Sequence, residues 1–164
     1  MKKIGLAVLC ILALLAFGCG REQTVSTPAG DVKMTKKGDA TTFEMNTGKG
    51  EKMNIVAGSG GDKSIALPDQ FPADVPVMPG AVVKLSVATG GNLSVHFSVK
   101  ASQADAIKFY EENLKAKGWE IEATMNMGAS SMVSAKKGKR QCVLTVVSEG
   151  GGSVVQVMVP SEKG

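Results

Sequence analysis

In several segments after residue 82, apolar residues recur at every second position. This alternation restricts the fold more than any other feature of the chain. The pattern runs through residues 83–87 and 93–99, which a Thr-Gly-Gly-Asn turn separates, and it returns in residues 119–127. A period of two places successive side chains on opposite faces of a β-strand, so each segment predicts a strand with one apolar face. Three more strands are expected at residues 131–136, 141–148 and 153–159.

A single helix is expected between the second and third of these strands. Ser102 can cap its N-terminus, and Gly118 stands where a helix commonly ends in a left-handed residue. The apolar residues between them share one face: Ala106, Ile107, Tyr110 and Leu114. Short turns between the strands require antiparallel neighbours. The sequence therefore predicts an α+β fold in which an antiparallel sheet of order ββαββββ packs one face against one helix.

The residues before this unit predict a weaker β-structure and a stiff connector. Residues 31–66 alternate β-prone runs with turns and predict a small β-meander, with its last strand at 63–67, that either packs on the main unit or stays partly mobile. Residues 67–80 hold four prolines, which favour an extended connector. The expected organisation is a signal peptide at 1–18, a tether at 19–30, a β-rich extension at 31–66, a connector at 67–80, an α+β domain at 81–160 and a tail at 161–164.

The N-terminus has the layout of an export signal. Lys2 and Lys3 precede an uncharged apolar run over residues 4–17. That run is too short to span a bilayer core, which needs about 20 helical residues. It has the length of the apolar region of a signal peptide.

The residues that follow indicate the type of signal. Ala16, Phe17 and Gly18 lead into Cys19, an ending that resembles the lipobox of bacterial lipoproteins, although Ala16 replaces the usual Leu and Phe17 the usual small residue. The resemblance implies cleavage before Cys19, lipid on its thiol and attachment to a membrane outside the cytoplasm. In a Gram-negative cell, Gly20 at the next position implies the periplasmic side of the outer membrane. The alternatives are an ordinary secretory signal and an uncut anchor.

The mature chain is expected to be mildly basic and to have no intramolecular disulfide, with an intermolecular bridge or a reactive thiol at Cys142 as the alternatives to its burial. Removing residues 1–18 takes away two lysines and lowers the formal net charge from +4 to +2, which gives no reason to expect a nucleic-acid partner. Cys10 leaves with the signal peptide and Cys19 carries lipid. Cys142 remains, and its apolar strand predicts a small buried hydrophobe.

No catalytic or metal-binding constellation emerges from the sequence. His96 is the one histidine and falls on the polar face of its strand. Met125 and Met127 could offer thioether ligands to Cu(I), but they share a strand face with Trp119 and are predicted to pack in the core. The glycine-rich segments lack phosphate-loop spacing. The carboxylate pairs predicted to lie on the surface are Glu111 with Glu112 and Glu120 with Glu122. No cofactor or metal is therefore expected.

Four cations gather at one turn near the C-terminus. They are Lys136, Lys137, Lys139 and Arg140, around Gly138. The simpler interpretation is a solvated turn. The functional one is contact with anionic lipid headgroups or a polyanion, since each cation near a charged bilayer contributes about 1 kcal/mol.

These observations favour a non-enzymatic, lipid-anchored binding or accessory domain of the cell envelope, with an unidentified envelope protein or ligand as its partner. The Pro-rich connector, the Phe109-Tyr110 pair and the Gly118-Trp119 ending resemble those of small uncharacterised bacterial lipoproteins, a resemblance that implies no activity. One alternative is a carrier of a small apolar ligand between sheet and helix. Another is a hydrolase-like enzyme that uses Ser, Lys or carboxylates without histidine.

Overall fold

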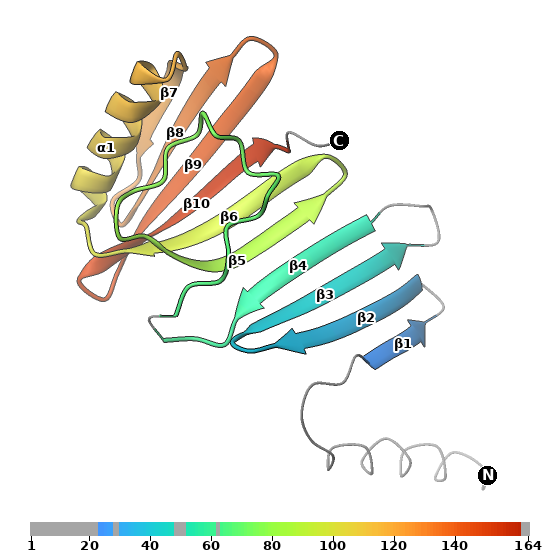
Figure 1. Cartoon of the computed structure of the whole chain (residues 1–164). Coiled ribbons are helices and arrows are strands. Elements are labelled where there is room, and N and C mark those ends of the chain that lie inside the picture. Colours follow the sequence, from blue (N-terminus) through green and yellow to red (C-terminus); the bar gives the residue numbers. More distant parts are fainter. Residues whose placement is uncertain (1–22, 28–29, 48–51, 62, 162–164) are drawn as a thin grey trace, which may run out of the picture.

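One antiparallel sheet organises the described part of the chain. The computed structural model describes residues 23–27, 30–47, 52–61 and 63–161. Within them, ten strands form a single sheet with one helix against it (Figure 1). The elements are β1 (Gln23–Thr27), β2 (Gly30–Lys37), β3 (Ala40–Thr47), β4 (Lys52–Gly58), β5 (Val82–Thr89), β6 (Asn92–Val99), α1 (Gln103–Ala116), β7 (Glu120–Asn126), β8 (Ser130–Lys137), β9 (Arg140–Glu149) and β10 (Gly152–Pro160). Across the sheet the order is β1-β2-β3-β4-β5-β6-β10-β9-β8-β7.

The predicted α+β class, an antiparallel sheet with one helix, is confirmed, but the order of elements differs from the predicted ββαββββ. Six strands precede α1 in the same sheet, because β4 pairs with β5 and joins the meander to it. β1 occupies part of the predicted tether at 19–30, where β-branched side chains favour a strand. The strand expected at 63–67 is absent. Ile65 there donates one main-chain hydrogen bond to Val83 O, at 3.0 Å, and Pro68 follows.

Capping interactions define both ends of α1. The Ser102 hydroxyl accepts a hydrogen bond from the Asp105 N–H at 3.2 Å. At the other end Gly118 has a φ of 80°, and the Trp119 N–H donates to Leu114 O at 2.9 Å. This ending is a Schellman motif, and Gly118 is the left-handed residue that the sequence predicts there.

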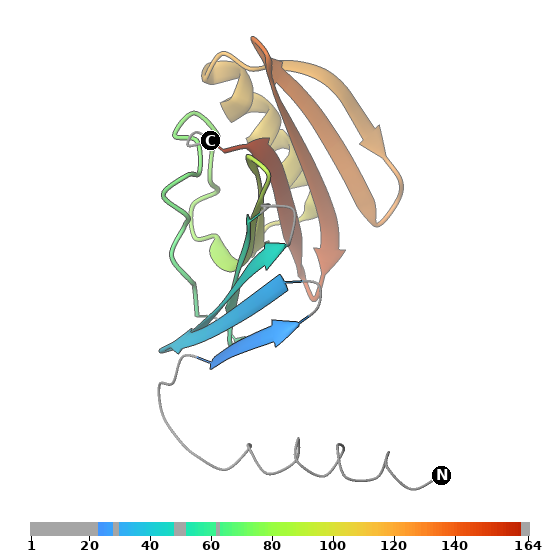
Figure 2. The same cartoon turned by 90° about the vertical axis from the view of Figure 1, so that its right-hand side faces the viewer.

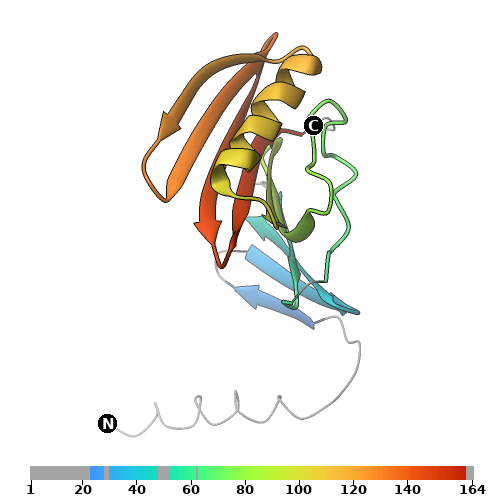
Figure 3. The same ribbon diagram turned by 90° about the vertical axis from the view of Figure 1, so that its left-hand side faces the viewer.

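α1 and the connector, residues 67–80, cover the same face of the sheet, which we call the helix-side face (Figure 3). The connector buries Phe71 and Val75 there. The Phe71 and Phe97 rings pack edge to face, with 6.1 Å between the ring centres. The helix buries Tyr110 and Leu114. The largest strand side chains that are fully enclosed beneath them are Phe97, Leu93, Leu144, Val95, Val133, Val146, Val155 and Val157. Each such burial stabilises the fold by about 1.5–3 kcal/mol.

The opposite face, which we call the helix-free face, has no second layer among the described residues. In Figure 2, α1 lies behind the strands. A β-bulge in β5 transfers predicted core residues to this face. Val83 pairs with Phe97, but after the bulge Leu85 pairs with His96. One inserted residue exchanges the faces of all that follow, so Leu85 and Val87 point away from the helix although their alternation with Val83 predicts one common face.

A second bulge, in β7, also moves a predicted core residue to the helix-free face. The register shifts between Ile121 and Ala123. This shift turns Met125 to the helix-free face, and the end of β7 is exposed on both faces, so that Met125 and Met127 are 45% and 61% exposed. The prediction that these two methionines pack in the core with Trp119 is therefore wrong.

Candidate functional site

Two of the four cations at the turn between β8 and β9 bind the connector, and the other two are exposed. Lys137 Nζ lies 2.7 Å from Oδ2 of Asp74 in the connector, and Arg140 Nη1 donates to Asp74 Oδ1 at 3.1 Å. Lys136 and Lys139 are exposed. Two of the four predicted contact residues thus hold the connector in place. Headgroup or polyanion contact through Lys136 and Lys139 stays a prediction.

Trp119 completes this junction. The Arg140 guanidinium carbon lies 5.0 Å from the centre of its ring, and its indole Nε1 donates to Asp74 O at 2.9 Å. Burial alone raises the pKa of Asp74, but hydrogen bonds and charges from Arg140 and Lys137 outweigh it and hold the pKa below its ordinary value. These contacts link the connector to the sheet and give the junction a structural role.

The predicted lipidation site, Cys19, lies outside the described residues, as do Gly20 and the rest of the lipobox. The described chain begins at Gln23, four positions after Cys19. Among the described residues, no helix is long and apolar enough to cross a membrane.

The histidine and the free cysteine of the described chain are poorly placed for chemistry. His96 is half-buried on the helix-free face, and this burial lowers its pKa. Cys142 is fully buried, which raises the pKa of its thiol to about 12 and keeps it protonated. In the described segments, no three His, Cys, Asp or Glu side chains are grouped to hold a metal ion.

The interface between α1 and the sheet is filled by side chains. Ala106, Tyr110 and Leu114 are fully buried there, and burial raises the pKa of Tyr110 to about 12. No residue of α1 lines either of the two pockets described next. The expected location of an apolar ligand, between sheet and helix, is therefore occupied by the core.

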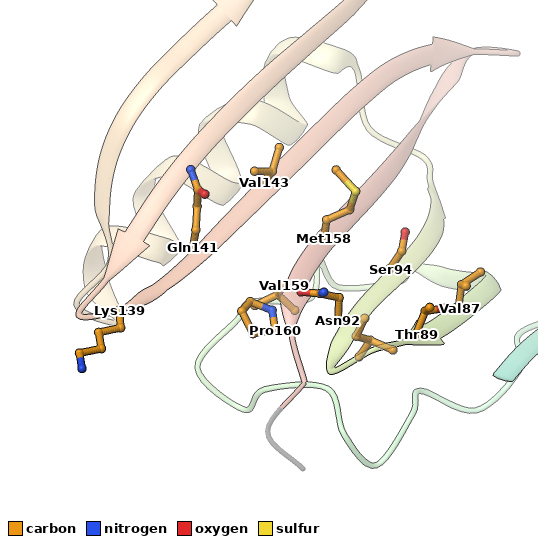
Figure 4. A pocket seen from close by; sticks show the side chains of 11 residues that line it. Val87, Thr89, Asn92, Ser94, Lys139, Gln141, Val143, Met158, Val159 and Pro160 are labelled. Atoms are coloured by element: carbon orange, nitrogen blue, oxygen red, sulfur yellow. The ribbon is translucent and has the colours of Figure 1, made fainter. Parts of the chain in front are cut away.

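An open pocket lies instead on the helix-free face, where the ends of β5, β6, β9 and β10 meet (Figure 4). Its volume is about 400 Å³, within the usual range for small-molecule sites. Its apolar walls come from Val87, Val143, Met158 and Pro160. Val87 reaches the pocket only because of the β5 bulge.

Polar groups surround these walls on several sides. Ser94 lies between Val87 and Met158 in the sheet register, and its hydroxyl accepts a hydrogen bond from Gln156 Nε2 at 3.1 Å. Thr89 Oγ1 is buried and has no hydrogen-bond partner among the described residues. The remaining polar residues of the lining are Asn92, Gln141 and Lys139. The pocket thus combines an apolar surface with hydrogen-bonding groups and one cation.

Sequence reasoning missed this pocket, although a signal for it exists. Val143 and Met158 are apolar residues in the polar phase of β9 and β10, although Val147 and Val154 interrupt the same phase outside the pocket. Lys139 belongs to the predicted basic turn, but its place at the edge of a pocket that Val143 and Pro160 also line (Figure 4) follows only from the folded sheet.

A second pocket, of about 360 Å³, lies between the connector and the helix-side face. Val56, Leu67, Pro68 and Ala88 are among its lining residues, most of which precede residue 81.

A family model described as START domain-like matches residues 81–159, which include β5, β6, α1 and nearly all of β7–β10. The match covers just under half of the chain. No curated protein and no solved structure matches significantly. START-like domains are generally binding domains, so this similarity favours a ligand-binding domain. The matched segment contains every lining residue of the helix-free pocket except Pro160.

Proposed function

We propose that the chain is a lipid-anchored binding protein of the cell envelope. Its α+β domain would hold a small amphiphilic ligand in the pocket on the helix-free face, without catalysis. The observation that carries this proposal is the pocket of about 400 Å³ within the segment similar to START-like domains. The pocket beneath the connector is the weaker candidate, because residues outside that segment form most of its wall.

The chemistry of the lining indicates the class of ligand. Val87, Val143 and Met158 can bury an apolar body, with a gain of about 25 cal/mol for each Å² removed from water. Lys139, on the β9 side of the pocket, can pair with an acidic end, and the unpaired Thr89 hydroxyl, on the β5 side, can hydrogen-bond to a polar group elsewhere on the ligand (Figure 4). A small molecule with an apolar body and a carboxylate, phosphate or sulfonate end fits this combination.

The environment of the Ser94 hydroxyl in the pocket supports binding rather than hydrolysis. A serine nucleophile needs an adjacent general base. Ser94 instead accepts a hydrogen bond from the Gln156 amide, which cannot remove a proton. This contact speaks against the hydrolase-like alternative that relies on Ser.

The lipobox-like ending at Cys19 supports the anchor. Lipid on this thiol would hold the domain at a membrane outside the cytoplasm, and Gly20 would direct it to the outer membrane of a Gram-negative cell. A Cys19→Ala variant should lose labelling by radioactive fatty acid and move to the soluble fraction. Persistent labelling would place the lipid on another residue.

The pocket is tested with 1-anilinonaphthalene-8-sulfonate, a fluorescent anionic amphiphile, and with dodecanoate as its competitor. Met158→Glu places a carboxylate against the apolar ligand surface. We expect it to weaken binding of the probe at least tenfold, or about 1.4 kcal/mol. The measurement is a fluorescence titration of the mature chain.

Val147→Glu is the matched control. Val147 and Met158 lie on the same face and are similarly exposed, at 39% and 42%, but only Met158 lines the pocket. Val147→Glu should change the affinity less than twofold. Equal losses in both variants, or probe binding that dodecanoate does not displace, would contradict the proposed site.

A further inference from the structure

A row of side chains crosses the helix-free face from the meander to the pocket. Cross-strand partners in an antiparallel sheet share a face. Pairing in the sheet therefore places seven residues side by side on seven neighbouring strands: Met34, Phe43, Ile55, Val87, Ser94, Met158 and Val143. All but Ser94 are apolar, and the last four line the pocket.

A second row runs beside the first on the meander. Val25, Val32, Met45 and Met53 follow one another through the pairs of β1 to β4. Val25 is 58% exposed and Met45 is 37% exposed. Together the two rows form an apolar surface that we call the meander face. An exposed apolar surface of this kind commonly marks an interaction site.

The carboxylates of these strands lie on one face. Asp31 and Glu44 alternate with the apolar residues of β2 and β3, so they lie on the helix-side face, together with three lysines of β2 and β4: Lys33, Lys37 and Lys52. Lys36 lies on the meander face, in register with Thr41. In the described parts of β1 to β6, no Asp or Glu is in register with the two apolar rows. A surface that is apolar, free of carboxylates and slightly basic is complementary to an anionic bilayer.

The sequence places the anchor close to this surface. Gln23 of β1 is four positions after Cys19, and a chain of four residue steps spans at most roughly 14 Å. Gln23 is itself in register with Met34, the first residue of the long row. A bilayer that holds lipid on Cys19 therefore lies within reach of the edge where the meander face begins.

We propose that the meander face docks on the bilayer that carries the lipid anchor, so that the helix-free pocket opens toward the membrane. This proposal rests on the lipid anchor of the proposed function. Val25 and Met45 would enter the headgroup region, and Lys36 would contact acidic headgroups. The row from Met34 to Val87 would provide an apolar route between the bilayer and the pocket.

The test uses the mature chain with Cys19→Ser, so that attachment depends on the face alone. The partner is a vesicle of phosphatidylcholine and phosphatidylglycerol in a ratio of about 7:3, and binding is measured by flotation over a range of lipid concentrations. Val25→Glu with Met45→Glu should lower the partition coefficient at least tenfold, because carboxylates oppose both apolar insertion and the anionic surface.

The control pair is Thr24→Glu with Asn46→Glu. These residues are exposed and adjacent to the first pair on the same strands, but they face the other side, and they add the same charge. The control should lower partitioning less than threefold. Equal loss in both double variants, or no vesicle binding by the parent chain, overturns the proposal.

Two further measurements separate this proposal from the alternatives. Sedimentation equilibrium without vesicles tests for a second copy, and self-association abolished by Val25→Glu with Met45→Glu would assign the face to a dimer instead. Titration with the fluorescent amphiphile tests the pocket independently, and the double variant should retain this binding within twofold. Failure of flotation with intact ligand binding counts against the docking face, whereas failure of the Cys19 labelling test counts against the anchor.

Discussion

The meander, β1 to β4, and the unit from β5 to β10 with α1 belong to one sheet but differ in what covers them. Hydrogen bonds run without interruption across the β4–β5 boundary. In the second unit, α1 and the connector seal one face over fully buried residues such as Phe97 and Leu144. In the meander, most apolar residues, such as Phe43 and Met45, point to the face that no described element covers.

This difference shows that a continuous ladder of hydrogen bonds does not distribute stability evenly. The net contribution of one hydrogen bond is only about 1 kcal/mol, since the unfolded chain bonds to water. Burial of apolar surface supplies the main driving force, and the meander has little of it. We therefore expect the unit from β5 to β10 with α1 to be stable, and the meander to be less stable with an apolar face available to a partner.

The largest test exchanges the same residue type in both regions. Phe97→Ala removes a fully buried ring and should cost about 3–5 kcal/mol of unfolding free energy. Phe43→Ala removes a half-buried ring and should cost about 1–2 kcal/mol. Urea unfolding gives both values, with Trp119 fluorescence reporting the second unit and far-UV circular dichroism the whole sheet. Equal costs would show that the meander has a core as dense as its neighbour.

A second pair of variants compares backbone constraints. A Cβ at Gly152 would overlap the main-chain oxygen of Val99, where β10 begins beside β6. Gly152→Ala therefore forces the two main chains apart and should cost about 3 kcal/mol of unfolding free energy. Gly38, in the β2–β3 turn, has a φ of 60°, and no atom lies within 4 Å of the position that a Cβ would take. Gly38→Ala should cost only the left-handed strain, about 1 kcal/mol. Equal stability of the Gly152→Ala and Gly38→Ala chains would contradict the expected difference between close main-chain packing at Gly152 and open space at Gly38.

Local signals in the sequence predicted the stable unit well. Ser102 and Gly118 marked the ends of α1 because capping depends on neighbouring residues alone. The alternation around Val95 and Phe97 indicated the buried face because the helix-side face is the one that is covered. The class of fold follows from such local patterns.

The bulges and the pocket depend on pairing between distant strands, which one sequence does not display. Lys84 is not a residue type that indicates a bulge, and the shift of register there becomes visible only from the partners of Val83 and Leu85. Asp74 lies 63 residues from Lys137 and 66 from Arg140, so nothing local indicated their ion pairs. Val143 and Met158 become parts of one site only when β9 and β10 pair.

The smallest expected effect compares two carboxylates and depends on pH. Asp74 is 23% exposed and binds Lys137 and Arg140, whereas the Asp39–Lys63 pair beside the meander is 51% and 67% exposed. The pKa of Asp74 is lowered in the folded protein, so its contribution is fully present above the unfolded pKa of 3.8 and is lost as pH falls through the folded pKa. Asp74→Asn should therefore cost about 1 kcal/mol at pH 7, a value already reduced for solvent screening of its partners.

The pH profile of unfolding decides whether this difference comes from charge. The free-energy gap between Asp74→Asn and the parent should close between about pH 4 and pH 2, because the protonated carboxyl no longer pairs with the two cations. The pKa of Asp39 is lowered too, first by its hydrogen bond from Lys63, but solvent screens this exposed pair, and Asp39→Asn should show no resolvable change. A loss from Asp39→Asn as large as that from Asp74→Asn would mean that contacts beside the meander stabilise the sheet as strongly as those of the covered unit. A gap for Asp74→Asn that persists at pH 2 would assign its effect to packing at the Trp119 junction instead.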